Sequence, residues 1–141
     1  MNREPIYAAL FAKVSALPGL VTTSRRLRHW DDVSDVEQPA LFQVQKREVQ
    51  VPRKGLPAKV TLECELYLYA NSGNDLTATA ATQINALMDA IEQALKPDVN
   101  GVQTLGGTVS HCWIEGEILS DEGYLGPQGV LIIPVKILVN H

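Results

Sequence analysis

Cysteine and long apolar runs are both scarce in this 141-residue sequence. It has only two cysteines, Cys64 and Cys112, each inside an apolar stretch, which excludes the disulfide framework of a small secreted protein. The longest apolar run, 130–139, is interrupted by Pro134 and Lys136 and is too short to span a bilayer. Because an acid and a proline stand close to the N-terminus, we expect no signal peptide. The sequence therefore predicts a soluble, cytoplasmic protein without a membrane partner.

Basic residues are also fewer than acidic residues. Lysine and arginine number 12 against 16 aspartates and glutamates, which gives a net charge of −4. A protein that neutralises many phosphates is usually basic, so this balance argues against a dedicated nucleic-acid binder. With 45% apolar and 20% charged residues, the composition is that of a globular protein. The length predicts one domain over 1–141, large enough to fold without disulfides or metals.

Signatures of catalysis and of cofactor binding are missing. No nucleophile elbow is present, and the only double glycine, Gly106-Gly107, precedes an expected strand rather than a helix that would receive a phosphate. The acidic loop 31–37 lacks the glycine of an EF-hand, and the sequence assigns it no role. No zinc spacing links the soft ligands His29, Cys64, His111, Cys112 and His141. We expect no catalytic residue, no metal and no cofactor.

Apolar periodicity predicts an α+β fold. Apolar residues recur at helical spacing over 4–17 and 76–96. Strand patterns cover 20–30, 40–51, 58–70, 108–119 and 128–139, and Pro134 predicts an edge position or a bulge in the last of these. Short connections predict a mostly antiparallel sheet of about five strands, in the order α-β-β-β-α-β-β, with two helices packed on it.

A long β-hairpin is the most unusual element of this pattern. Residues 58–70 alternate strictly between apolar and mostly polar side chains. One face of the expected strand carries Val60, Leu62, Cys64, Leu66 and Leu68. The other face carries Tyr67 and Tyr69 with the polar residues. Such a strand is far longer than the usual five or six residues. We expect its outer half, with the basic tip 53–55, to project beyond the body and to reach a neighbouring subunit or another partner.

Two basic clusters and three aromatic side chains form the candidate partner or subunit interface. Local basic stripes fit an acidic partner surface, and exposed aromatic residues are typical of interfaces. The candidates are Arg25, Arg26, Arg28, Trp30, Lys46, Arg47, Arg53, Lys54, Tyr67 and Tyr69.

Six segments together resemble one known family. They are 3–11 (REPIYAALF), 25–33 (RRLRHWDDV), 37–42 (EQPALF), 66–70 (LYLYA), 103–107 (QTLGG) and 132–137 (IIPVKI). This combination resembles the tail terminator proteins (tail completion, minor tail protein U-like) of long-tailed, lambda-like bacteriophages and prophages. The resemblance covers nearly the whole chain.

The resemblance implies a structural function without catalysis. Members of the family form a six-membered ring on the head-proximal end of the tail tube. The ring stops polymerisation of the tube protein and offers a surface to the head connector, while DNA passes through its lumen without sequence-specific binding. The implied partners are therefore further copies of the chain, the tail tube protein and the head completion or connector protein. The implied location is the virion tail, and the host cytoplasm during assembly.

Two other classes stay open at this point. One is a different head–tail connector or tail tube component, which would form open polymers rather than closed rings. The other is a small enzyme or ligand-binding protein with an unrecognised site, which would show a deep pocket with convergent polar groups.

Overall fold

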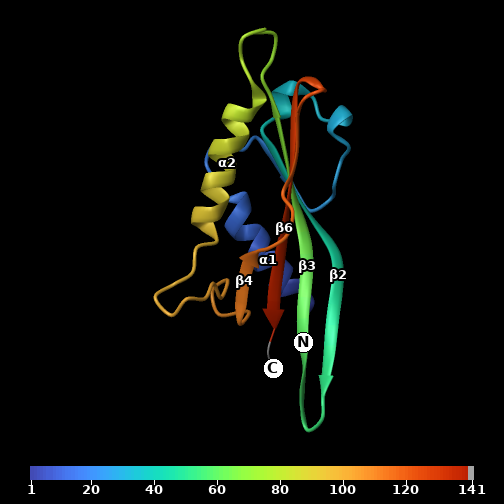
Figure 1. The fold of residues 1–141 in the computed structure, drawn as a ribbon, viewed down its shortest axis with the longest axis vertical. Helices are drawn as coiled ribbons and strands as arrows, with labels where there is room; N and C mark the ends of the chain where they lie inside the picture. Colours follow the sequence, from blue (N-terminus) through green and yellow to red (C-terminus); the bar gives the residue numbers. More distant parts are fainter. Residues whose placement is uncertain (140–141) are drawn as a thin grey trace.

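The computed structural model describes residues 1–139. Along the chain, these residues form α1 (Arg3–Ser15), β1 (Thr22–Ser24), the short 3₁₀ turns η1 (Trp30–Asp32) and η2 (Asp35–Glu37), β2 (Ala40–Arg53), β3 (Leu56–Asn71), α2 (Ala80–Ala94), β4 (His111–Ile114), β5 (Leu119–Gly123) and β6 (Gly126–Val139). Figure 1 shows a long, narrow sheet with α1 and α2 beside it. The predicted α+β class with two helices is confirmed.

The sheet has six strands within the described residues, in the order β1-β2-β3-β6-β4, with β5 also paired to β6. All pairings are antiparallel except β1 with β2, which is parallel and pairs Thr22 with Ala40. The chain between these two strands, which holds η1 and η2, is the crossover that parallel pairing requires. The sheet is therefore mixed rather than wholly antiparallel.

The main core lies between the two helices and one face of the sheet. Ile6, Leu10 and Val14 of α1 and the apolar side of α2 pack against the inward side chains of β3 and β6. On β3 these inward side chains are Val60, Leu62, Cys64, Leu66 and Leu68, as the alternation predicts. Strict period-two alternation buries one face of a strand, so this assignment is confirmed.

A second, smaller core lies on the opposite face of the sheet, at the end that carries η1 and η2. Phe42, Tyr69 and Val130 pack there beneath Val33, and Trp30 and Leu125 cover the rim. No helix of residues 1–139 covers the rest of this face (Figure 1). The prediction that Tyr69 is an exposed aromatic is therefore wrong: its side chain is only 3% exposed.

Two predicted strands have clearly different bounds in the structure. The stretch 20–30 forms only the short β1, because the chain turns away from the sheet at Arg25. The stretch 108–119 contains β4 and only the first residue of β5, with a bend between the two strands in which Gly116 has a φ of +119°. The prediction of a mostly antiparallel sheet of about five strands is confirmed, since residues 1–139 form six strands and only β1 with β2 is parallel.

Pro134 does not lie at a sheet edge, because β3 pairs with β6 on one side and both β4 and β5 pair with it on the other. The residue lies beside the interruption between β4 and β5, where Glu115 N donates to Pro134 O at 3.4 Å. Proline offers no N–H to a ladder, so the neighbouring strand breaks there. The structure therefore accommodates Pro134 by the interruption between β4 and β5, and not by an edge position of β6.

Candidate functional site

The hairpin formed by β2 and β3 extends past the rest of the sheet (Figure 1). Pairing of β3 with β6 begins at Val60, so the earlier residues of β3 pair only with β2 in the described part of the chain. All of residues 50–59 are exposed except Ala58, which is half-buried. We call residues 50–59 the hairpin arm.

The tip of the hairpin arm is a tight turn. Arg53 pairs with Leu56, and Gly55 has a φ of +74°, a conformation that glycine adopts without the steric cost of a side chain. Arg53 Nε donates to Pro57 O at 2.8 Å, a bond that closes the turn from the side. The arm is therefore an ordered hairpin whose side chains point into solvent.

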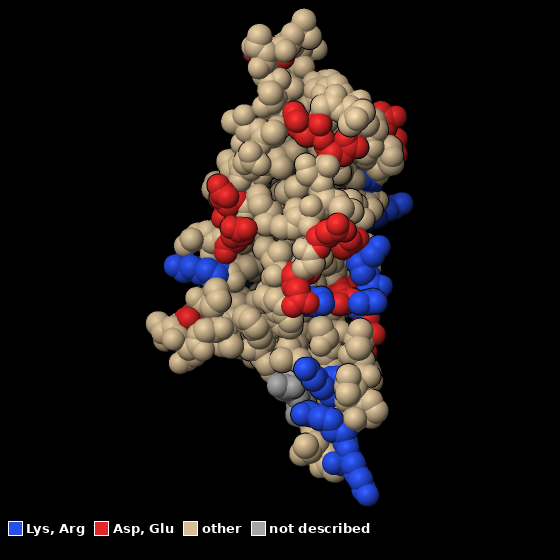
Figure 2. Space-filling model, viewed as in Figure 1, with Lys and Arg blue, Asp and Glu red and all other residues tan. Residues whose placement is uncertain are grey.

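The surface of the hairpin arm is basic and apolar together. Arg53, Lys54 and Lys59 make no ion pair with any residue in 1–139. On the same arm, Val51 is 50% exposed and Leu56 is 62% exposed. Figure 2 shows basic side chains gathered on this end of the molecule. Unpaired cations beside exposed apolar side chains are typical of a surface that binds a partner.

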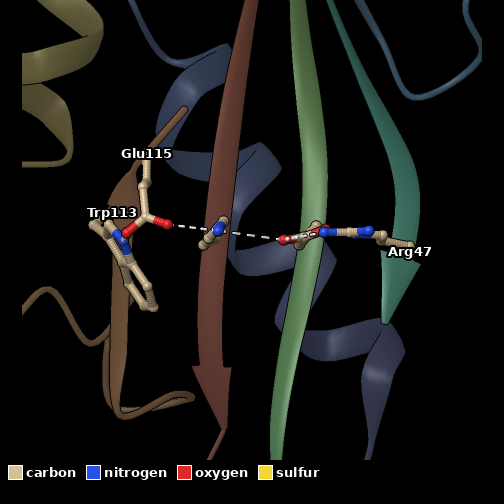
Figure 3. A network of polar contacts seen from close by, with 5 residues as sticks. Arg47, Trp113 and Glu115 are labelled. Atoms are coloured by element: carbon tan, nitrogen blue, oxygen red, sulfur yellow. Dashed lines mark hydrogen bonds and ion pairs between the residues drawn. The ribbon is translucent and has the colours of Figure 1, made fainter. Parts of the chain in front are cut away.

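A row of alternating charges crosses the uncovered face of the sheet (Figure 3). Arg47 of β2 pairs with Glu63 of β3, and Lys136 Nζ of β6 lies 3.5 Å from Glu63 Oε1 and 2.5 Å from Glu115 Oε2. Trp113 Nε1 donates to Glu115 Oε1 at 3.1 Å. Hydrogen bonds from the cations lower the pKa of Glu63 and of Glu115. The row is thus neutralised within one chain.

Lys46 and Tyr67 belong to the same region of this face. Lys46 Nζ lies 3.3 Å from Glu65 Oε1, and Tyr67 Oη donates to the same oxygen at 3.2 Å. A shallow hollow of about 350 Å³ opens here, between β2 and the turn after β4. Of the predicted interface residues, Lys46, Arg47 and Tyr67 are therefore brought together, and each has a partner in its own chain.

The other predicted interface residues separate into two groups. Arg25 bonds to Glu4, and Arg28 Nη2 donates to Glu37 Oε2 at 2.8 Å with its guanidinium over the ring of Phe42. Arg26 is exposed, whereas Trp30 is half-buried on the second core. Tyr69 Oη donates to Arg28 O at 2.7 Å, so it fixes this segment to the sheet. Arg53 and Lys54 lie apart, on the arm.

The end of the molecule opposite the arm carries a surface that sequence reasoning missed. Here η1 and η2 lie beside the turn between β5 and β6 (Figure 1). We call it the acidic end, defined by the exposed residues Asp31, Asp32, Asp35, Val36, Asp121, Glu122 and Tyr124. None of its five carboxylates forms an ion pair within the described chain. Val36 is 78% exposed and Tyr124 is 97% exposed.

The two segments of the acidic end are held together by side-chain amides. Gln38 Nε2 donates to Gln128 Oε1 at 2.7 Å, and Gln128 Nε2 donates to Gln38 Oε1 at 2.8 Å. The acidic loop 31–37 was visible in the sequence, but its position beside 121–124 depends on the pairing of β5 with β6. No local pattern signals that contact.

The soft ligands do not converge in the described chain. Cys64 and Cys112 are buried, and burial raises the pKa of both thiols, that of Cys112 to about 12. Among residues 1–139, no group of three or more His, Cys, Asp or Glu side chains is placed to hold a metal ion. His141 lies outside the described residues. In the same part of the chain, neither helix has the length and apolar character needed to cross a bilayer.

Comparison with known proteins adds no relative. No protein-family model matches the sequence, and no curated protein is significantly similar to it.

Proposed function

We propose that this protein is a structural subunit of a phage tail, similar to the tail terminators of long-tailed phages. Copies of the chain form a ring, six in number as in the family it resembles, on the head-proximal end of the tail tube. The ring ends polymerisation of the tube and offers a surface for head attachment. DNA passes through its lumen, and no catalysis is involved.

The observation that carries this proposal is the hairpin arm. It projects from the body, exposes unpaired Lys54 and Lys59, and buries almost nothing in its own chain. A closed ring needs a heterologous contact, in which one surface of a subunit meets a different surface of the next. An ordered arm that leaves its own body supplies one half of such a contact.

The resemblance supports the same function from the sequence. Its six segments fall in α1, in the stretch that follows β1, at the start of β2, in β3, in the loop before β4 and in β6. They therefore belong to the elements that build the sheet and its cover rather than to one local motif.

The test is the growth of tail tubes. The tube protein of the phage or prophage that carries this chain is polymerised with and without the purified chain, and tube lengths are measured by electron microscopy. We expect the chain to stop elongation and to sit at one end of each tube. Tubes that elongate equally, or a chain that decorates them along their length, would contradict the proposal and favour a tube or connector component.

A pair of charge-reversal variants makes this test specific to the arm. Arg53→Glu with Lys54→Glu changes the tip, and we expect it to abolish capping. Lys13→Glu with Lys96→Glu makes the same change of charge at a half-buried and an exposed lysine of the body, and we expect capping to persist. Equal capping by the two variants would show that the arm is not used. Circular dichroism checks that both variants fold.

A further inference from the structure

We infer that the hairpin arm of one copy binds the acidic end of a second copy. The inference rests on the proposed function and deepens it, because it names the surface that receives the arm. The partner is a second molecule of this chain, and the contact joins opposite ends of two subunits.

Charge is the first reason for this pairing. The arm presents Arg53, Lys54 and Lys59, and the acidic end presents five carboxylates; none of these side chains has an ion-pair partner in its own described chain. Elsewhere the chain neutralises many of its charges internally, as in the row across β2, β3 and β6. Three cations at one end and five carboxylates at the other thus lack an ion pair within 1–139, and Figure 2 shows basic side chains at the arm and acidic side chains towards the opposite end. Complementary potentials of this kind steer association and fix its orientation.

Exposed apolar side chains occur at both ends as well. Val51 and Leu56 stand on the arm, and Val36 and Tyr124 stand at the acidic end. Apolar side chains gain free energy when a partner removes them from water. Aromatic residues such as Tyr124 are also enriched in the buried centres of interfaces. Each end therefore combines exposed apolar side chains with unpaired charges of one sign.

The geometry favours a heterologous contact over a symmetric one. The arm and the acidic end lie at opposite ends of an elongated molecule, so they cannot meet within one chain (Figure 1). A two-fold contact of arm with arm would bring the unpaired Lys54 and Lys59 of two copies together. Like charges across an interface oppose association. A head-to-tail contact avoids this repulsion and, if its rotation closes, produces a ring.

Cysteine cross-linking tests the contact directly. Chains with Lys54→Cys are mixed with differently tagged chains with Asp35→Cys and treated with a short bismaleimide. The native thiols are buried, so the new cysteines are the ones that react. We expect a heterodimer whose yield falls as salt is added, because exposed charges are screened. The matched control mixes Lys54→Cys with Glu92→Cys, an exposed acid on α2.

The heterodimer yields of the two mixtures decide whether the arm binds the acidic end. A heterodimer in the first mixture well above the control supports the inference. Equal yields in the two mixtures, no heterodimer, or a strong homodimer of Lys54→Cys alone would overturn it.

A charge exchange provides a second, independent test in solution. One chain carries Lys54→Glu with Lys59→Glu, and another carries Asp121→Lys with Glu122→Lys. Alone, each variant carries the same sign of charge at residues 54 and 59 as at residues 121 and 122, and we expect roughly tenfold weaker self-association by sedimentation. In the mixture, residues 54 and 59 of one chain again meet residues of opposite charge at 121 and 122 of the other, and association returns. Failure of the mixture to associate better than its components would refute the contact.

The two proposals fail in different ways. If the cross-link forms but assembly grows without limit, the contact is correct and the closed terminator ring is not. If a discrete ring forms without the arm-to-end cross-link, the ring stands and the contact is wrong.

Discussion

At the scale of single residues, the amide pair Gln38 and Gln128 determines where the acidic end lies. Both side chains are buried, at 8% and 5% exposed, and their amides exchange two hydrogen bonds. Gln38 Nε2 also donates to Val33 O at 3.0 Å, and Gln128 Nε2 donates to Gly129 O at 2.9 Å. The pair therefore fixes the segment of η1 and η2 on β6.

Replacing one member of this pair tests its contribution. We expect Gln38→Leu to lower the free energy of unfolding by about 1–3 kcal/mol, because it removes both amide bonds to Gln128 and the side-chain donor to the buried Val33 O. Urea denaturation measures this difference. The control is Gln93→Leu, at an exposed position of α2, which we expect to change stability by less than about 0.5 kcal/mol. Equal effects of the two substitutions would show that the amide pair is not structurally important.

At this scale, the sequence predicts the features that depend on neighbouring residues and misses those that depend on residues far along the chain. The inward side chains of β3 were predictable, because alternation is a local property of a strand. The burial of Gln38 was not, because its amide partner lies 90 positions further along the chain. The burial of Tyr69 was missed for a related reason: η1 and η2 fold back over the end of its strand.

At the scale of elements, an ion pair attaches α1 to β2. Arg3 donates to Glu48 through Nε at 2.6 Å and through Nη2 at 2.8 Å. This bidentate bond lowers the pKa of Glu48 from its ordinary value to about 2. Since a lowered pKa in the folded state stabilises the ionised form, the contribution is present above the ordinary glutamate pKa and is lost as the pH falls towards about 2.

The pH dependence of a Glu48 variant follows from this sign. We expect Glu48→Gln to melt below the native protein at pH 7, because the amide cannot pair with the charge of Arg3. The difference in Tm between the variant and the native protein narrows as the pH falls below the ordinary pKa of glutamate. It disappears near pH 2, where Glu48 itself becomes protonated. Glu92→Gln, at an exposed acid of α2, serves as the control. A Tm difference that is constant with pH would contradict the role of the ion pair.

The backbone of β6 comes close to α2 at Gly129, and this contact sets the position of α2 on the sheet. A Cβ at Gly129 of β6 would lie 2.6 Å from Ile84 Cδ1 and 2.8 Å from Ala80 Cβ. We expect Gly129→Ala to destabilise the fold by about 1–3 kcal/mol, the usual cost of overpacking a core. Adding Ile84→Val removes the nearest atom, so the double variant is expected to lose less than the sum of the single losses. Strict additivity in denaturation experiments would show that α2 does not pack on Gly129 in this way.

The sheet was also only partly predictable at this scale. Long runs such as β3 and β6 carry their own periodicity, and the two helices carry an apolar stripe. The break between β4 and β5 depends on Gly116 lying against Pro134 of a different strand, with the glycine Cβ position 3.2 Å from Pro134 Cγ. A contact across strands is not contained in the pattern of one of them.

At the scale of the whole molecule, the chain is elongated and its two ends differ. One end is the basic hairpin arm, and the other is the acidic end (Figures 1 and 2). The projecting, basic tip 53–55 was predictable, because a hairpin of such long alternating strands extends beyond the rest of the domain. The acidic end was not, since it is assembled from 31–36 and 121–124 by tertiary contacts. Net charge alone hides this arrangement.

The central claim is that the chain assembles into a closed ring, and the native mass of the purified protein tests it most directly. Light scattering is measured over rising protein concentration, at low salt and with divalent cation present. The account predicts one discrete species at six times the 15.4 kDa mass of the chain, whose size stays constant once it forms. A protein that stops at a dimer, remains a monomer at the highest concentration, or grows continuously with concentration would contradict it.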